Sequence, residues 1–285
     1  MQAAMECLPC MMAQAVRVAR LAAPDDEAVQ QNVVRVFADH VARHGLTGSP
    51  PAMLRPLYAA VPRLTGTADP FAQVKQHANR RAAQLLPGLR SRVSAAADPL
   101  HTALNIAIIG NYMDAGTGIE FDWEGALETE NRADWSARWY PSFRTALQTA
   151  RTVVILGDNC GEIVLDTLLV EQLNALGLDV TYAVRGAPVL NDATMEDALG
   201  CGMTQLCRVV DSGADSPGAY PESLSAGFTH TLMQADVVLA KGQGNFEGLR
   251  GHLRPVWFAF KAKCAVVAQM LDVPQGTSMF LLQQP

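Results

Sequence analysis

The second half of the chain repeats one pattern that few folds accommodate: a short apolar run, a polar or glycine-rich segment, and a helical stretch. Four such runs lie at 152–156, 180–184, 206–210 and 235–240, and "VWFAFKAKC" at 256–264 is a fifth candidate strand. Apolar strands separated by helices are typical of a parallel sheet covered on both faces. The pattern therefore predicts an α/β domain with a mostly parallel sheet flanked by helices.

The first hundred residues differ, because their apolar residues recur at helical spacing. Helices are expected over 10–20 and 27–43. The segment 47–70 contains five prolines, so we expect a loop there with short helices between the breaks. A helix resumes at 71 and is expected to end at Pro87. Residues 1–97 are therefore predicted to form an all-helical lobe, and residues 98–285 the α/β domain.

Composition excludes several classes of protein. Apolar residues make up 49% of the 285 residues, which is enough for a sizeable core and argues against disorder. The formal net charge is −6 and no Lys/Arg-rich block occurs, so no nucleic-acid or membrane partner is expected. No apolar run reaches 18 residues, and the N-terminus lacks the features of a signal peptide. We expect a cytoplasmic protein with reduced cysteines and leave its oligomeric state open.

Polar segments follow three of the predicted strands: "GDNCGE", "RGAPVLND" and "KGQGNFE". In parallel sheets ligands bind beyond the carboxyl ends of the strands, where these segments meet. Oxygen-rich side chains suit a hard divalent cation, while glycine N–H groups and a lysine suit an anion. One edge would gather Asp158, Asn159, Glu162, Arg185, Asn191, Asp192, Lys241, Gln243 and Asn245. The sequence therefore predicts a site for a metal ion and a phosphate.

Each of these segments also has a purely structural interpretation. Asp158 and Asn159 could cap the helix that begins near Glu162, and Asp192 could cap the helix after it. "KGQGN" could be an ordinary glycine turn, since it is not a P-loop, and "GDNCGE" is not the dinucleotide-binding fingerprint. The joint arrival of these segments at one sheet edge favours a ligand site.

Six segments together carry a resemblance: "CLPC", "GNYMDAG", "GDNCGEIVLD", "RGAPVLNDATMEDA", "AKGQGNFE" and "FKAKC". They resemble the DUF89 family, the damage-control phosphatases, and within it the archaeal and bacterial branch with an N-terminal CxxC. The resemblance runs nearly end to end. It implies a helical lobe packed on a Rossmann-like α/β lobe, and a metal-dependent phosphatase, a hydrolase, that acts on small phosphorylated metabolites such as sugar phosphates.

The resemblance also assigns roles to positions of this sequence. The metal ligands would be Asp158, Asn159 and Asp192, which with Lys241 would also form the catalytic set. The phosphate-binding residue would be Lys241, and Asn111 and Asp114 would contact substrate or support the residues that do. Apart from the resemblance, we expect Glu162 and Asn245 at the same sheet edge to bind substrate. The expected cofactor is a divalent ion, Mg²⁺, Mn²⁺, Co²⁺ or Ni²⁺. The family members differ in substrate, so the resemblance leaves the metabolite open.

A mechanism consistent with these roles uses the cation to neutralise charge on the phosphoryl group and to orient a water molecule. Asp158 is the first choice for the base and Glu162 the second. A phospho-aspartyl route through Asp158 is disfavoured, because no second acid follows two residues later. The alternative functions are a carboxyl methyltransferase, which would need a glycine-rich loop after its first strand, and a non-catalytic module that binds phosphorylated metabolites.

The remaining candidate residues are cysteines and tryptophans. Cys7 and Cys10 lie three apart on one helical face and could be buried reduced thiols, a metal site or a disulfide, in that order of preference. Only an unpredictable fold would bring Cys201 and Cys207 to them. Three tryptophans are expected to anchor the interface between the lobes, namely Trp123, Trp135 and Trp139.

Overall fold

The structure is a computed structural model that describes residues 1–110, 138–252 and 254–284. Four residues named above lie outside this part of the chain: Asn111, Asp114, Trp123 and Trp135. In the described part, no helix combines the length and apolar character needed to cross a membrane.

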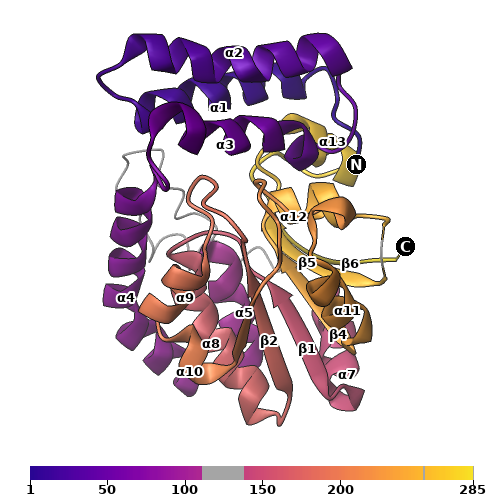
Figure 1. Ribbon diagram of the computed structural model, residues 1–285. Coiled ribbons are helices and arrows are strands. Elements are labelled where there is room, and N and C mark those ends of the chain that lie inside the picture. The colour runs from indigo at the N-terminus through magenta and orange to yellow at the C-terminus, as the bar shows by residue number, and fades with distance from the viewer. Residues whose placement is uncertain (111–137, 253, 285) are drawn as a thin grey trace.

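A six-stranded sheet in the order β3-β2-β1-β4-β5-β6 forms the centre of the molecule (Figure 1). Pairing is parallel from β3 to β5 and antiparallel between β5 and β6. The order reverses between β1 and β4, and such a reversal is where α/β sheets bind ligands. The strands are β1 (Thr152–Leu156), β2 (Asp179–Val184), β3 (Arg208–Asp211), β4 (Val237–Lys241), β5 (Val256–Lys261) and β6 (Ser278–Gln283).

The α/β fold with a mostly parallel sheet is confirmed, with two differences in the strands. The predicted run 206–210 begins too early, because Leu206 ends helix α10 (Met203–Leu206). β6 was not predicted; it runs antiparallel beside β5, and the connection between the two strands contains a short helix at 265–271.

The two faces of the sheet pack into separate hydrophobic cores, because alternate residues of a strand point to opposite sides. In β1, Val153 and Ile155 join one core, whereas Val154 and Leu156 join the other. The first core is covered by α4 (Ala72–Ala95), α5 (Pro99–Ile109), α7 (Tyr140–Thr149), α8 (Glu162–Ala175), α9 (Met195–Gly200) and α10. The second is covered by α11 (Ala226–Gln234), α12 (Gln243–Leu249) and α13 (Ala265–Leu271).

The N-terminal lobe consists of α1 (Cys7–Ala22), α2 (Glu27–His44) and α3 (Pro50–Thr65), which lie across the upper end of the body in Figure 1. Their apolar faces form a third core around Phe37 and Leu57. The prediction of a broken loop over 47–70 was wrong, because α3 is continuous through Pro56 and Pro62.

Two local features explain how α3 tolerates its prolines. Pro50 and Pro51 occupy the first turn, where the missing N–H groups have no intrahelical acceptor anyway. The hydroxyl of Ser49 caps the helix by accepting a hydrogen bond from Ala52 N. Burial of one face then outweighs the loss of hydrogen bonds at the interior prolines. In the same way α4 continues beyond Pro87, where it was predicted to end.

Helix α4 belongs by its packing to the α/β body, since Ala78, Ala82 and Leu89 are part of the core that contains α8. The core of the N-terminal lobe, by contrast, draws on residues up to Phe71 and on Val189 from the body. The division of the chain at 97/98 stays a prediction, and hydrophobic packing places α4 with the α/β body.

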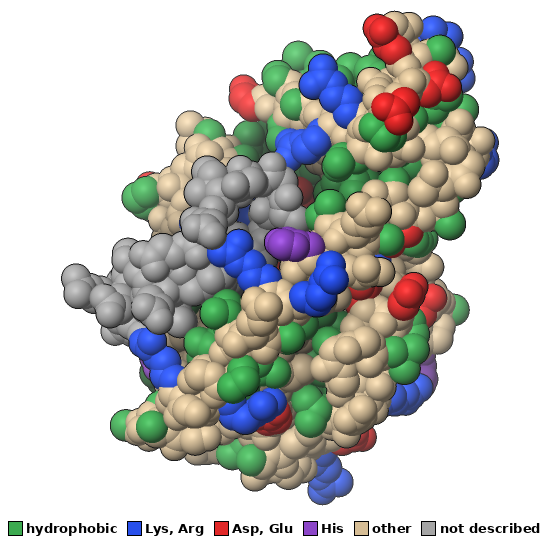
Figure 2. Space-filling model, turned by 90° about the vertical axis from the view of Figure 1, so that its left-hand side faces the viewer, with side chains coloured by type: hydrophobic (Ala, Val, Ile, Leu, Met, Phe, Trp, Pro, Cys, Tyr) green, Lys and Arg blue, Asp and Glu red, His purple; other side chains and the backbone are tan. Residues whose placement is uncertain are grey.

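The face of the molecule seen in Figure 2 carries positively and negatively charged side chains, with hydrophobic side chains scattered among them.

Candidate active site

The loops after β1 and β2 are joined by backbone hydrogen bonds, which bring three of the predicted residues together. Ala193 N donates to Asp158 O over 2.8 Å, and Cys160 N donates to Asn191 O over 2.7 Å. Asn159 and Asp192 form an isolated antiparallel bridge. The three predicted metal ligands, Asp158, Asn159 and Asp192, therefore lie side by side, and all line one cavity.

The capping interpretation of these residues is excluded by the helix ends. Helix α8 has Gly161 as its N-cap, with no side-chain cap. Helix α9 is capped by Thr194, whose hydroxyl and backbone pair with Asp197 in a capping box. The carboxylates of Asp158 and Asp192 thus serve neither helix, and their burial at the sheet edge needs another explanation.

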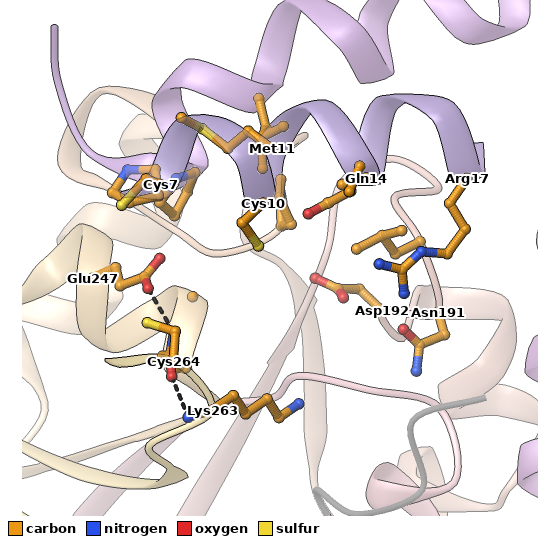
Figure 3. A pocket seen from close by; sticks show the side chains of 18 of the residues that line it. Cys7, Cys10, Met11, Gln14, Arg17, Asn191, Asp192, Glu247, Lys263 and Cys264 are labelled. Atoms are coloured by element: carbon orange, nitrogen blue, oxygen red, sulfur yellow. Dashed lines mark hydrogen bonds between the residues drawn. The ribbon is translucent and has the colours of Figure 1, made fainter. Parts of the chain in front are cut away.

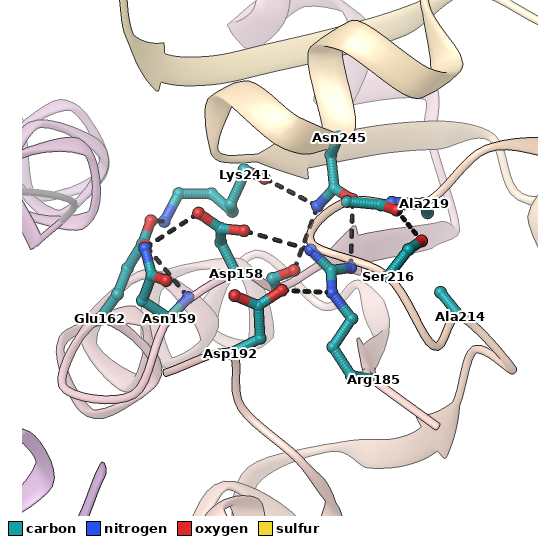
Figure 4. A network of polar contacts seen from close by, with 12 residues as sticks. Asp158, Asn159, Glu162, Arg185, Asp192, Ala214, Ser216, Ala219, Lys241 and Asn245 are labelled. Atoms are coloured by element: carbon teal, nitrogen blue, oxygen red, sulfur yellow. Dashed lines mark hydrogen bonds and ion pairs between the residues drawn. The ribbon is translucent and has the colours of Figure 1, made fainter. Parts of the chain in front are cut away.

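Arg185, at the end of β2, holds both carboxylates (Figure 4). Its Nε donates to Asp192 Oδ2 over 2.6 Å, and its Nη2 donates to Asp158 Oδ1 over 3.1 Å. The Asn159 amide donates to Asp158 Oδ2 over 2.9 Å. Burial raises the pKa of Asp192 to about 7, and the charge of Asp158 adds to this, although Arg185 opposes it. When both carboxylates are ionised, they and the single guanidinium give this cluster a net negative charge.

This donor set fits a hard divalent cation. Asp192 Oδ1 and Asn159 Oδ1 have no partner in the described part of the chain, and an added cation would relieve the repulsion between the carboxylates. No group of three or more His, Cys, Asp and Glu side chains among the described residues is arranged to hold a metal ion. The third oxygen here belongs to an amide.

The first glycine of "KGQGN" has a steric role next to Asp158. Gly242 lies at φ +80°, and a Cβ placed there would come within 2.0 Å of Asp158 Oδ2. Any side chain at this position would push the carboxylate out of place. The segment is therefore shaped to admit Asp158, which the sequence alone did not indicate.

Lys241 is placed differently from the expectation. Its side chain is fully buried and does not line the cavity. Its ammonium group donates to Asp166 Oδ1 over 2.8 Å, to Ala107 O over 3.0 Å, and to Glu162 Oε1. Burial acts to lower the pKa of Lys241, but the two carboxylates raise it above its ordinary value. A phosphate could reach this lysine only if the cluster opened.

Glu162 and Asn245 are also enclosed and have polar partners. Burial raises the pKa of Glu162 to about 7 against the opposing charge of Lys241. Asn245 donates to Lys241 O and Gly157 O over 2.7 and 3.1 Å, and its Oδ1 accepts from Arg185 Nη1 and from Ala219 N. Neither side chain lines the cavity. Their contacts fix the loops that carry Asp158 and Arg185.

The cavity has a volume of about 860 Å³ and extends from the metal-ligand candidates to α1 of the N-terminal lobe (Figure 3). Lys263, after β5, lines it and is exposed, and its positive charge acts to lower the pKa of Asp192. Arg17, Gln14 and Glu247 line it as well. The assignment of roles overlooked Lys263, although it lies within the segment "FKAKC".

The cysteine pair also borders this cavity, and Cys264 joins it from the body. All three are free thiols, and Cys10 is exposed rather than buried as expected. Partial desolvation of the two thiol groups raises the pKa of Cys7 and Cys10. Cys201 and Cys207 pack beside the core around α8 instead. Trp139 meets Trp257 edge to face, with ring centroids 6.3 Å apart, so it packs within the body.

A doubly covered parallel sheet with clustered carboxylates in a cavity at its reversal point defines an α/β protein with an oxygen-rich ligand site. Residues 3–279 match the damage-control phosphatase ARMT1-like domain, and the chain belongs to this family. The resemblance to DUF89 proteins is thereby confirmed.

Individual relatives span almost the same length. A damage-control phosphatase of Archaeoglobus fulgidus is 29% identical over 95% of this chain and 95% of its own. A damage-control phosphatase of Pyrococcus horikoshii is 29% identical over 95% and 94%. The crystal structure of a DUF89 family protein from Pyrococcus horikoshii covers 100% of both chains with a TM-score of 0.88 and 26% identity.

Proposed function

We propose that the protein is a metal-dependent phosphatase that hydrolyses small phosphorylated metabolites. The observation that carries the proposal is the convergence of Asp158, Asn159 and Asp192 on one cavity, where they cap no helix. The cation would be held by these three residues. Once bound, it supplies Lewis-acid charge stabilisation for the phosphoryl group.

Residues of the protein would bind the phosphoryl oxygens and hold the carboxylates in place. Lys263 lines the cavity beside Asp192 and supplies the positive charge for the phosphoryl oxygens that we expected from Lys241. Arg185 holds the two carboxylates through separate nitrogens, so it fixes their spacing before substrate arrives. Lys241 supports the loop from behind by pairing with Glu162 and Asp166.

Hydrolysis requires that water attack phosphorus, that the bond to the leaving alcohol break, and that the water proton find an acceptor. Asp158 lies in the cavity wall, whereas Glu162 is sealed behind it and paired with Lys241. Asp158 is therefore the better of the two bases. The water proton passes to this carboxylate, and the alcohol leaves with a proton from solvent.

The proposal is tested by measuring phosphate release from p-nitrophenyl phosphate before and after exhaustive chelation. We expect loss of activity on chelation and recovery with Mg²⁺, Mn²⁺, Co²⁺ or Ni²⁺. Asp158→Asn and Asp192→Asn should each lose metal binding and at least about 10²-fold in kcat. Asp211→Asn, at the end of β3 and outside the cavity lining, is the matched control.

Three results would contradict the proposal. Full turnover by chelated enzyme would exclude the metal requirement. Absence of phosphate release with every metal and substrate, together with retained ligand binding, would favour the non-catalytic binding module. Methyl transfer to a carboxylate substrate without phosphate release would favour the methyltransferase.

A further inference from the structure

Arg17 projects from α1 into the cavity without a partner. Its guanidinium lies near Asp192 and Asn191 in Figure 3, across the cavity from the cysteines. It makes no hydrogen bond or ion pair with any residue that the structure describes. The same helix directs Gln14 toward the lobe instead, where its amide donates to Tyr58 over 2.5 Å. Arg17 is exposed at the cavity wall, so its donors are open to solvent and to an anion that enters the cavity.

Asn191 provides a second, independent sign of a missing ligand. Its side chain is only 9% exposed, it lines the cavity, and its Nδ2 has no hydrogen-bond partner in the described structure. A buried amide nitrogen without an acceptor is unfavourable and therefore uncommon in a folded protein. An acceptor oxygen on a bound molecule would satisfy it.

The cavity is much larger than one phosphoryl group needs. At about 860 Å³ it lies in the range of sites for whole metabolites or drug-sized ligands. Under the proposed function, the cation site and Lys263 already serve the reacting phosphoryl group. Arg17 comes from the other lobe, so its donors are left for a different part of the substrate.

We propose that Arg17 and Asn191 form a subsite for a second anionic group, a carboxylate or a second phosphate, on the phosphorylated substrate. The proposal rests on the proposed function and names its substrate class: phosphorylated metabolites that carry a further oxyanion. The planar guanidinium fork matches the two oxygens of either group, and the asparagine amide supplies a third donor.

Matched substrates test this directly. 3-Phosphoglycerate and glycerol 3-phosphate differ in a carboxylate, and fructose 1,6-bisphosphate and fructose 1-phosphate differ in a phosphate. In the wild-type protein we expect kcat/KM to favour at least one doubly anionic member over its partner by about ten-fold or more. Which pair shows the preference distinguishes a carboxylate from a phosphate.

The variants then assign the preference to the subsite. Arg17→Met should abolish it while lowering kcat/KM for p-nitrophenyl phosphate less than three-fold, because that substrate carries no second anionic group for Arg17 to bind. Arg17→Lys should restore part of it, because it keeps the charge without the fork. Arg35→Met, on the exposed face of α2, is the control and should leave the preference intact.

Two outcomes would overturn the inference. An equal loss for all substrates in Arg17→Met would show that Arg17 holds the reacting phosphoryl group itself. No wild-type preference in either pair would show that no second anion is recognised. If no substrate is hydrolysed, calorimetric binding of the same compounds decides: tighter, Arg17-dependent binding of the double anions keeps the subsite while the phosphatase proposal fails.

Discussion

At the scale of single residues, Lys241 shows how a correct pattern can leave a role undetermined. The segment "KGQGN" was expected at the sheet edge, and its lysine does end β4 there. The direction of its side chain depends on α8, where Glu162 and Asp166 lie one turn apart in the buried first half of the helix. Two acids on a buried helix require a cation. The two acids of "GEIVLD" indicate that a buried cation is needed, but the sequence could not show which lysine pairs with them.

Replacing Lys241 should therefore affect folding before it affects chemistry. Lys241→Met leaves two carboxylates buried without their cation, which costs about 3–5 kcal/mol of unfolding free energy. Lys263→Met removes an exposed side chain, so its unfolding free energy should change by less than about 0.5 kcal/mol. Its kcat/KM should nevertheless fall on the order of 10²-fold, because it loses charge stabilisation at the phosphoryl group. Urea unfolding and steady-state kinetics on both variants measure these effects.

The reverse pattern would restore the original assignment of Lys241 to phosphate. In that case Lys241→Met would keep wild-type stability and lose phosphate inhibition, whereas Lys263→Met would be kinetically silent. Lys261→Met, two residues from Lys263 on the same segment and outside the cavity lining, controls for the loss of a positive charge as such.

At the scale of elements, periodicity predicted the helices and the five parallel strands, because each buries a regular face. It failed where tertiary packing overrode a local signal, as in α3 and α4, which continue through prolines. It also could not show that α4 connects the two ligand loops. Asn79 on α4 accepts from Gly161 N over 2.6 Å and donates to Asp197 over 3.2 Å.

This connection predicts a kinetic effect from a residue outside the cavity lining. Asn79→Ala removes the acceptor for Gly161 N, so the loop that carries Asp158 and Asn159 loses one of its fixed points. We expect about a ten-fold fall in kcat with little change in KM, since a small misplacement of catalytic groups is costly. Asn79→Asp keeps an acceptor for Gly161 N and should recover part of kcat. Equal kcat in all three proteins would show that the loop needs no support from α4.

The neighbouring ion pair should stabilise the fold across the neutral range. Lys75 Nζ lies 2.7 Å from Asp197 Oδ2 and 3.0 Å from Asp69 Oδ2. Burial acts to raise the pKa of Asp197, but hydrogen bonds from Lys75 and Thr194 hold it below its ordinary value. Burial likewise acts to lower the pKa of Lys75, and Asp197 raises it.

The directions of these shifts fix the pH dependence. A carboxyl group whose pKa is lower in the folded than in the unfolded protein stabilises the fold at pH values above its unfolded-state pKa, about 3.9. This stabilisation is lost as the pH falls through the folded-state pKa. A lysine whose pKa is higher in the folded protein stabilises the fold at pH values below its unfolded-state pKa, about 10.4. This stabilisation is lost as the pH rises through the folded-state pKa. The unfolding free-energy gap between wild type and Asp197→Asn should therefore be constant from about pH 5 to 9 and shrink below about pH 4. Urea titrations at each pH measure it, and a gap that persists unchanged at low pH would contradict this account.

At the scale of the whole molecule, the sequence predicted two lobes but not the cavity that they share. Its walls come from α1 and α3 on one side and from the loops after β1, β2 and β5 on the other. No local pattern reports which helix face will meet which loop, so Arg17 could not be assigned to the site from the sequence. The N-terminal lobe has its own core, with Val189 of the body packed into it.

A lobe with a separate core should open more readily than the body and should be stabilised by ligand. Native-state hydrogen exchange should give α1–α3 lower opening free energies than β1 and β4. Phe37→Ala, at a fully buried position in that core, should lower the opening free energies in α1–α3 by about 3–5 kcal/mol and leave β1 almost unchanged. Adding 3-phosphoglycerate to the metal-free protein, which should not hydrolyse it, should raise protection in α1, because Arg17 would hold its carboxylate while Lys263 holds its phosphate across the cavity. Uniform loss of protection throughout the molecule in Phe37→Ala would mean that the three cores unfold as one unit, and that the cavity is not bounded by separately opening parts.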